Sequence, residues 1–176
     1  TEPVTGCIKD TTHLIQILSS PMVGFTIADS NGCVPFTTAF IDTINAPGTS
    51  LIWDFDDGQI SYQPNMVDHT YSGTGCYDIT LTVTNANGCV NSFTQNDLVC
   101  VYNQPIAQFS VDQNEHNTFD PIFEFNNLSE YASYYIWDFG DGNKTNEMNP
   151  IHEYANYGNY FVTLYAYNQG CMDSTY

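Results

Sequence analysis

Apolar and polar residues alternate along much of this 176-residue chain. The longest runs are YDITLTV at 77–83 and YFVTLYA at 160–166, in which the first, third, fifth and seventh residues are apolar. Neighbouring side chains of a β-strand point to opposite faces, so this period predicts strands with one face packed against a second sheet. GFTI, TTAF and LIWDF in one half, and QFSV, IFEF and YIWDF in the other, predict further strands.

Aspartate-glycine dipeptides follow two of these runs, at 57–58 and at 141–142. Such a dipeptide favours a tight hairpin turn because glycine tolerates positive φ. About seven short strands in each stretch of roughly 80 residues, without helical periodicity, are typical of an immunoglobulin-like β-sandwich. We therefore expect an all-β protein made of tandem immunoglobulin-like sandwiches.

The chain contains an internal repeat, which is clearest around its two tryptophans. WDFDDG at 53–58 returns as WDFGDG at 137–142, which is 84 positions later. The NGC that ends at Cys89 likewise returns as the QGC that ends at Cys171. Self-similarity at a fixed period indicates a tandem array of structural modules.

A third copy of the last repeated element lies at the start, because residues 5–25 resemble the segment that closes the first copy. We therefore assign residues 1–20 to the closing strand of a preceding module. Residues 21–104 form one module, and residues 105–176 form a second module whose closing strand is missing. The linker at 103–105 is short and contains proline, which favours a semi-rigid rod.

The two tryptophans are predicted to be core residues. In a strand, Trp53 and Phe55 point to the same face, and a buried tryptophan on the third strand recurs in sandwiches of this size. The following aspartate and glycine make the turn, and His69, two residues before a tyrosine in both copies, has a structural role. The expected motif residues are Trp53, Phe55, Asp57, Gly58, His69 and Tyr71 in the first copy, and Trp137, Phe139, Asp141, Gly142, His152 and Tyr154 in the second.

The strings W-D-F-G-D-G, N-P-x-H-x-Y and G-x-Y-x-V-T-L between residues 137 and 164 resemble the PKD domain, first named from polycystic kidney disease protein. The first copy departs from this pattern, because Asp56 stands where the second has Gly140 and the Asn-Pro before His69 is lost. Aspartate tolerates a left-handed backbone better than most residues, so we expect the turn to survive.

The combination of Gly-Cys-Val-Pro at 32–35 with Gly-Cys at 88–89 is similar to PKD repeats of very long secreted proteins of the Bacteroidota. Those proteins include gliding-motility adhesins and other cargo of the type IX secretion system. The resemblance implies an extracellular or cell-surface location for this chain.

The formal charge is −18, from two Lys/Arg against twenty Asp/Glu. Nucleic acids and anionic membranes need a basic face, so neither is expected as a partner. No apolar run approaches the length of a membrane span, which argues against direct membrane insertion. The charge is consistent with a solvated surface or with binding of a divalent cation.

Calcium is the cation to consider, because some PKD modules bind it and carboxylate oxygens suit it. The candidate ligands are Asp54, Asp56, Asp57 and Asp68, which folding alone would have to bring together. No Asp-x-Asp-x-Asp-Gly loop is present, and we favour the solvated surface. No metal or other cofactor is therefore assigned.

Catalysis is not expected. Adjacent carboxylates such as Asp56 and Asp57 could act as acid and base only in a cleft that separates their pKa values, and a hairpin turn leaves them in water. On this interpretation Asp57→Asn is mild. No G-x-S-x-G, H-E-x-x-H or Cys/His nucleophile arrangement occurs, so the chain is predicted not to be an enzyme.

Six cysteines without a CxxC motif indicate disulfides and an oxidising compartment. One pairing scheme joins Cys76 to Cys100 across a bulged hairpin and leaves Cys33 with Cys89. The competing scheme joins Cys33 to Cys76. Cys7 and Cys171 lack partners at matching places, so they are free or bridge to residues outside the chain.

Two functions fit these features. The first is a non-catalytic extracellular stalk or spacer with adhesive contacts in a long repeat protein, whose partners are neighbouring PKD modules and surface polysaccharide or protein ligands. The second is an accessory module of a secreted hydrolase that aids substrate binding through surface aromatics such as Tyr131, Tyr134 and Tyr157. Repetition of the module favours the first.

Overall fold

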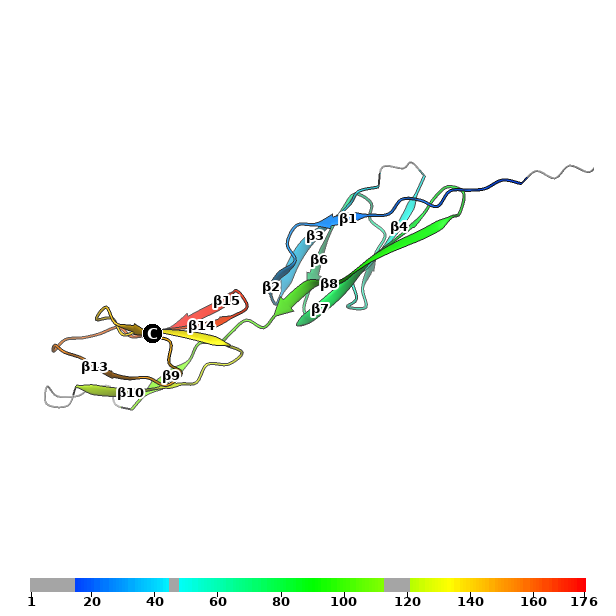
Figure 1. The fold of residues 1–176 in the computed structure, drawn as a ribbon. Helices are drawn as coiled ribbons and strands as arrows, with labels where there is room; N and C mark the ends of the chain where they lie inside the picture. The colour runs from blue at the N-terminus through cyan, green and yellow to red at the C-terminus, as the bar shows by residue number, and fades with distance from the viewer. Residues whose placement is uncertain (1–14, 45–47, 113–120) are drawn as a thin grey trace, which may run out of the picture.

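The computed structural model describes residues 15–44, 48–112 and 121–176, and all regular structure in these ranges is β-strand. Two β-sandwiches lie end to end along an elongated molecule (Figure 1). The first module contains β1 to β8 and the second contains β9 to β15. The prediction of an all-β, immunoglobulin-like architecture is confirmed.

The first module packs a three-stranded sheet on a five-stranded sheet. The smaller sheet has the order β1 (Phe25–Ile27), β3 (Phe36–Asp42), β6 (Met66–Tyr71). The larger has the order β2 (Asn31–Cys33), β8 (Val90–Tyr102), β7 (Gly75–Thr84), β4 (Ser50–Asp54), β5 (Ile60–Ser61). All pairs are antiparallel except β2 with β8, which are parallel.

The second module likewise packs two sheets face to face, one of three strands and one of four. One sheet has the order β13 (Ile151–Glu153), β10 (Ile122–Asn127), β9 (Phe109–Val111). The other has the order β12 (Lys144–Thr145), β11 (Tyr134–Asp138), β14 (Thr163–Asn168), β15 (Cys171–Thr175). β15 corresponds to the first half of β8, and β14 begins later in its module than β7 does.

The core of each module is built around its tryptophan. Trp53 and Trp137 have no exposed surface, and their indole N–H groups donate to the carbonyl oxygens of Gln63 and Glu147 at 3.2 and 3.0 Å. The apolar face of the long alternating run is buried as its period predicts. The fully buried residues on this face are Ile79, Leu81 and Val83 in β7 and Leu164 and Ala166 in β14.

The turn after each tryptophan strand contains a residue with a left-handed backbone, Asp56 at φ 62° and Gly140 at φ 76°. In the second module a Cβ at Gly140 would lie 2.7 Å from the carbonyl oxygen of Phe161. In the first module the Asp56 carboxylate instead accepts a hydrogen bond from the backbone N–H of Asp78, at 3.1 Å. The aspartate is therefore accommodated by a local backbone arrangement that the second module does not share.

Residues 15–24 contain no strand. Residues 1–14 lie outside the described part of the chain, so the assignment of 1–20 to a closing strand of a preceding module stays a prediction. None of the described ranges contains a helix of the length and apolar character needed to cross a membrane.

Candidate functional site

Each hexapeptide turn carries a buried Asp–His pair. In the first module the Asp57 carboxylate lies 2.8 Å from Nε2 of His69, and the two side chains are only 14% and 8% exposed. The imidazole stacks on the ring of Phe55 at 3.9 Å and meets Tyr71 edge-on at 4.7 Å. Strand β6 therefore places the histidine directly beneath the turn that follows β4.

The second module repeats this arrangement closely. Asp141 lies 2.8 Å from Nε2 of His152, which stacks on Phe139 at 3.9 Å. Tyr154 donates its hydroxyl to the Phe139 carbonyl oxygen at 2.9 Å, and burial, followed by the charge of Asp141, raises the pKa of Tyr154 to about 12. The tyrosine is therefore a neutral donor at physiological pH.

The expectation that the turn leaves its carboxylates in water was wrong for Asp57. Its second carboxylate oxygen accepts the backbone N–H of Gln59 at 3.0 Å, and Asp141 accepts that of Asn143 at 2.9 Å. Burial alone would raise the pKa of Asp141. Its hydrogen bonds from the backbone N–H of Asn143 and from His152 hold this pKa below its ordinary value. The histidine of each pair packs against aromatic rings, and its aspartate also binds the backbone of the turn, so the pair locks the turn.

Sequence reasoning identified both members of each pair but missed their contact. The signal was the recurrence of Asp-Gly together with His-x-Tyr in both copies. If the aspartate and the histidine bind each other, both must be present in each copy, and both are.

The four candidate calcium ligands do not converge, and three of them have separate partners in the structure. Asp54 accepts the backbone N–H of Asp56, Asp56 accepts that of Asp78, and Asp57 binds His69. Asp68 is exposed on β6. Within the described ranges no group of three or more His, Cys, Asp or Glu side chains is arranged to hold a metal ion.

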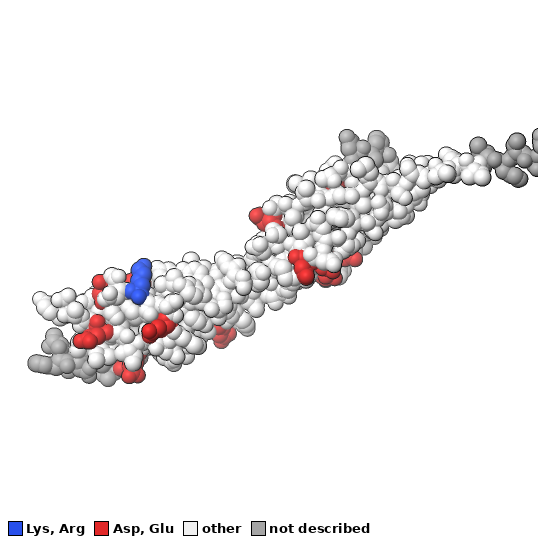
Figure 2. Space-filling view, in the orientation of Figure 1, with Lys and Arg blue, Asp and Glu red and all other residues white. Residues whose placement is uncertain are grey.

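Acidic side chains form small separate groups on the face shown in Figure 2, and one basic patch lies among those of the second module. Lys144 Nζ is 2.8 Å from the Asp138 carboxylate. This hydrogen bond, with one from the backbone N–H of Gly140, lowers the pKa of Asp138. Lys144 is exposed and Asp138 partly so, and such a surface ion pair contributes little to stability.

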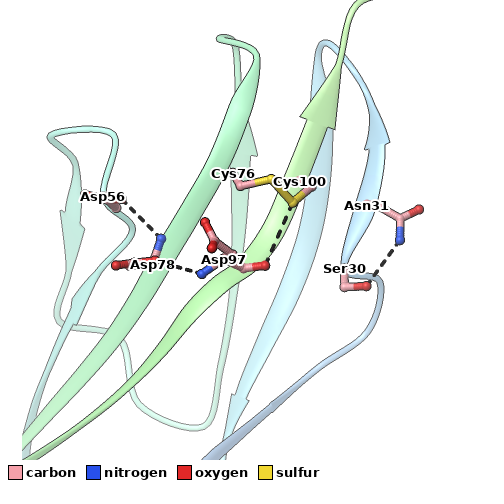
Figure 3. Close-up of a disulfide and its surroundings, with 7 residues drawn as sticks. All are labelled: Ser30, Asn31, Asp56, Cys76, Asp78, Asp97 and Cys100. Carbon is pink, nitrogen blue, oxygen red and sulfur yellow. Dashed lines mark hydrogen bonds between the residues drawn. A yellow bond between two sulfur atoms is a disulfide. The ribbon is translucent and has the colours of Figure 1, made fainter. Parts of the chain in front are cut away.

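A disulfide joins Cys76 to Cys100 on the neighbouring strands β7 and β8, as Figure 3 shows. The two residues are directly opposite in the strand register, and a register shift follows between Tyr77 and Ile79. This is the bulged hairpin bond named by the first of the two pairing schemes.

A second disulfide joins Cys33 of the first module to Cys171 of the second. The predicted pairing of Cys33 with Cys89, the alternative with Cys76, and the unpaired state of Cys171 were therefore wrong. The reason lies in the topology. Parallel pairing with β8 sets Cys33 opposite Tyr102, at the end of that strand, whereas Cys89 precedes the start of the same 13-residue strand. Cys89 is free, and Cys7 lies outside the described residues.

The linker between the modules is held by hydrogen bonds to the β14–β15 hairpin. Asn168 donates its amide to the carbonyl oxygen of Asn103 at 3.0 Å, and the backbone N–H of Ala107 donates to Asp173 at 2.8 Å. The Gln104 side-chain amide also donates to the Met172 carbonyl oxygen at 2.8 Å. Pro105, between these contacts, is fully buried. The junction is thus closed by one covalent bond and three hydrogen bonds.

The second module also has a groove of about 690 Å³, whose lining includes Phe123, Tyr154, Tyr157 and Tyr160. In the first module the residue equivalent to Tyr160 is Tyr77, which pairs with Val99 of β8. The position equivalent to Tyr160 is thus paired with a strand in the first module, and we assign no ligand to the groove of the second.

A family model described as the PKD domain matches residues 20–101 and again residues 102–175. Among solved structures, the PKD1 domain of Vibrio anguillarum Epp is 24% identical, with a TM-score of 0.39, over 47% of this chain and 96% of that one. A carbohydrate-binding-module structure of the β-sandwich superfamily is 14% identical (TM-score 0.44; 83% and 84% covered), and the amphioxus IgVJ-C2 molecule is 13% identical (TM-score 0.44; 82% and 96% covered).

The chain therefore belongs to the PKD domain family and contains two PKD domains in tandem. PKD domains are generally non-catalytic modules that serve as binding or spacer units. Together with disulfides, which persist in oxidising environments, they are typical of extracellular proteins.

Proposed function

We propose that this chain is a non-catalytic spacer within a long extracellular repeat protein, of the kind found in gliding-motility adhesins and other type IX-secreted surface proteins. Residues 21–104 and 105–176 are its modules, and residues 1–20 close a preceding one. The spacer holds the domains on either side of it at a set distance.

The observation that carries this proposal is the junction. A spacer must resist bending, and the Cys33–Cys171 disulfide adds a second covalent connection beside the linker. The buried Pro105 and the three linker hydrogen bonds remove further freedom. Neither Asp–His pair lines the groove of the second module, and the hydrogen bonds of both pairs account for the conspicuous polar residues of the motif by stability.

Small-angle X-ray scattering on the 176-residue chain tests the rigidity that a spacer needs. The oxidised chain is expected to give a single extended length. The double variant Cys33→Ser, Cys171→Ser is expected to keep its secondary structure and to show a broader distribution of lengths. An oxidised chain that is already as broad as the variant would contradict the proposal.

Deletion of residues 21–104 from the parent protein tests the function itself. The deletion should shorten the projection and leave the activities of the terminal domains intact, and an unrelated sandwich of equal length should restore the projection. The alternative, an accessory module of a secreted hydrolase, predicts instead that the isolated chain binds a polysaccharide or protein polymer.

The exposed Tyr131, Tyr134 and Tyr157 are the surface aromatics available for such binding, at 58%, 47% and 92% exposure. Titration of the isolated chain against these polymers, with and without calcium, separates the two functions. Saturable binding that is lost on Tyr157→Ala would favour the hydrolase module over the spacer.

A further inference from the structure

Cys89 and Cys171 occupy the same place in their modules. Each is the first residue after a glycine with positive φ, Gly88 at 80° and Gly170 at 96°. Cys171 lies opposite Asn168 in the β14–β15 hairpin, and the backbone N–H of Asn85 donates to the Cys89 carbonyl oxygen in the β7–β8 hairpin. The two cysteines therefore close equivalent hairpins at the end of the module where the chain enters.

The two positions differ in what covers them. Cys171 is 1% exposed and bonded to Cys33 of the module before it. Cys89 is partly exposed and free. Cys89 therefore lacks the partner cysteine of a preceding module that Cys33 provides to Cys171.

An independent observation shows on which side of the first module a preceding module would lie. Asn85 donates its side-chain amide to the carbonyl oxygen of Ser19 at 3.0 Å, as its equivalent Asn168 does to that of Asn103. Ser19 and Asn103 are 84 residues apart, the same spacing as the two tryptophans. The segment before the first module therefore enters it by the path that the linker takes into the second.

A second contact supports the same path. Asn91 lies two residues after Cys89 and donates its side-chain amide to the Pro21 carbonyl oxygen at 3.0 Å. Two residues after Cys171, Asp173 accepts the backbone N–H of Ala107 in the corresponding linker. In both modules the residue two positions after the cysteine thus holds the incoming chain.

From this juxtaposition we propose that Cys89 is a module-linking site, which forms a disulfide with a cysteine of a preceding PKD module at the position of Cys33. A module that carries both cysteines is then bonded to a neighbour at each end, because Cys33 and Cys89 lie at opposite ends of β8. The second module has no cysteine between residues 101 and 170, so it offers only Cys171.

The bond forms by thiol–disulfide exchange with a small disulfide such as oxidised glutathione. One cysteine thiolate attacks the small disulfide and releases one glutathione thiolate, and the second cysteine attacks the resulting mixed disulfide and releases the other. The two protein thiols together lose two electrons, and these electrons reduce one oxidised glutathione to two molecules of glutathione. Their two protons pass to the released thiolates.

The test inserts a second copy of residues 21–104 directly after residue 104 of the full chain, so that the first copy precedes the second at the natural spacing. The chain is refolded in a glutathione redox buffer and mapped by non-reducing peptide mass spectrometry. We expect Cys33 of the first copy to be bonded to Cys89 of the second, and Cys33 of the second copy to be bonded to Cys171. The insertion then adds four cysteines but no alkylatable thiol.

The inserted chain contains its own controls. The bond to Cys171 reports that junctions form under the conditions used, and a Cys76–Cys100 bond in each copy reports that each copy has folded. A Cys33→Ser substitution in the first copy should return one alkylatable thiol, at Cys89 of the second. If Cys89 of the second copy stays alkylatable in the unsubstituted chain while the control bonds form, the proposal is wrong.

Discussion

Removal of the carboxylate from the Asp141–His152 pair tests whether the hexapeptide turn stabilises its module. Asp141→Ala leaves Nε2 of His152 without a partner in a side chain that is only 12% exposed. An unsatisfied buried polar group costs about 1–3 kcal/mol, and the exposed backbone N–H of Asn143 can bind water instead. We therefore expect a loss of about 2 kcal/mol in the free energy of unfolding of the second module.

In a domain of this size, each kcal/mol shifts Tm by roughly 4–8 °C, so the expected decrease in Tm is about 8–16 °C. Asp141→Asn should cost less, about 1 kcal/mol, because its amide oxygen still accepts the Asn143 N–H and its amide group can donate to the other histidine tautomer. Asp57→Ala should act equally on the first module. The prediction from the sequence was that Asp57→Asn is mild, and by analogy with Asp141→Asn we now expect it to cost about 1 kcal/mol.

The assay is hydrogen exchange measured by mass spectrometry, which resolves the two modules, combined with calorimetry. The matched control is Asp68→Asn, an exposed aspartate for which about 0.5 kcal/mol or less is expected. A Tm for Asp141→Ala equal to that of this control would refute the stabilising role of the pair.

The lowered pKa of Asp141 adds a pH dependence with a definite sign. A depressed carboxyl pKa contributes stability above the unfolded-state pKa near 3.8, and this contribution is lost as the pH falls through the folded-state value. The difference between wild type and Asp141→Asn should therefore be full at pH 6 and shrink below about pH 4. A difference that does not change between pH 6 and pH 3 would show that the ionised carboxylate is not what stabilises the turn.

Three further changes have defined outcomes. Trp53→Ala and Trp137→Ala should each cost about 3–5 kcal/mol in their own module alone, by hydrogen exchange, and equal losses in both modules would contradict independent cores. Replacing Cys76 and Cys100 by serine together opens a link that spans 24 residues and should cost about 3 kcal/mol in denaturant unfolding; no loss would mean that the bond constrains nothing. Gly140→Ala places a Cβ against backbone at 2.7 Å and should lower the second module's Tm, and an unchanged Tm would show that this turn shifts freely.

Local periodicity was enough to predict the fold of each module. The alternation in 77–83 and the repeated Trp53 strand predicted which residues are buried, because those features depend only on strand geometry and on one apolar face. The left-handed backbone at Asp56 followed from the same reasoning about turns.

Contacts between distant segments could not be predicted in this way. The partner of Cys33 depends on which end of β8 its short parallel strand meets, and on the module that is packed against that end. The sequence did contain a hint, because Cys171 shares its repeat position with Cys89 and the second module has no cysteine that could match Cys33. The Asp57–His69 contact was missed because β6 follows the turn by several residues and no local rule places it there.

The Cys33–Cys171 disulfide has a mechanical consequence. When the two chain ends are pulled apart, the sulfur bridge joins residue 33 directly to residue 171, so the chain between them, a sequence separation of 138, cannot be drawn out while the bond is intact. At about 3.5 Å per extended residue, the bridge withholds roughly 480 Å of contour length from extension. Both tryptophans lie inside that loop, and a stretched chain would therefore give way only in the strands outside it until the bridge is reduced.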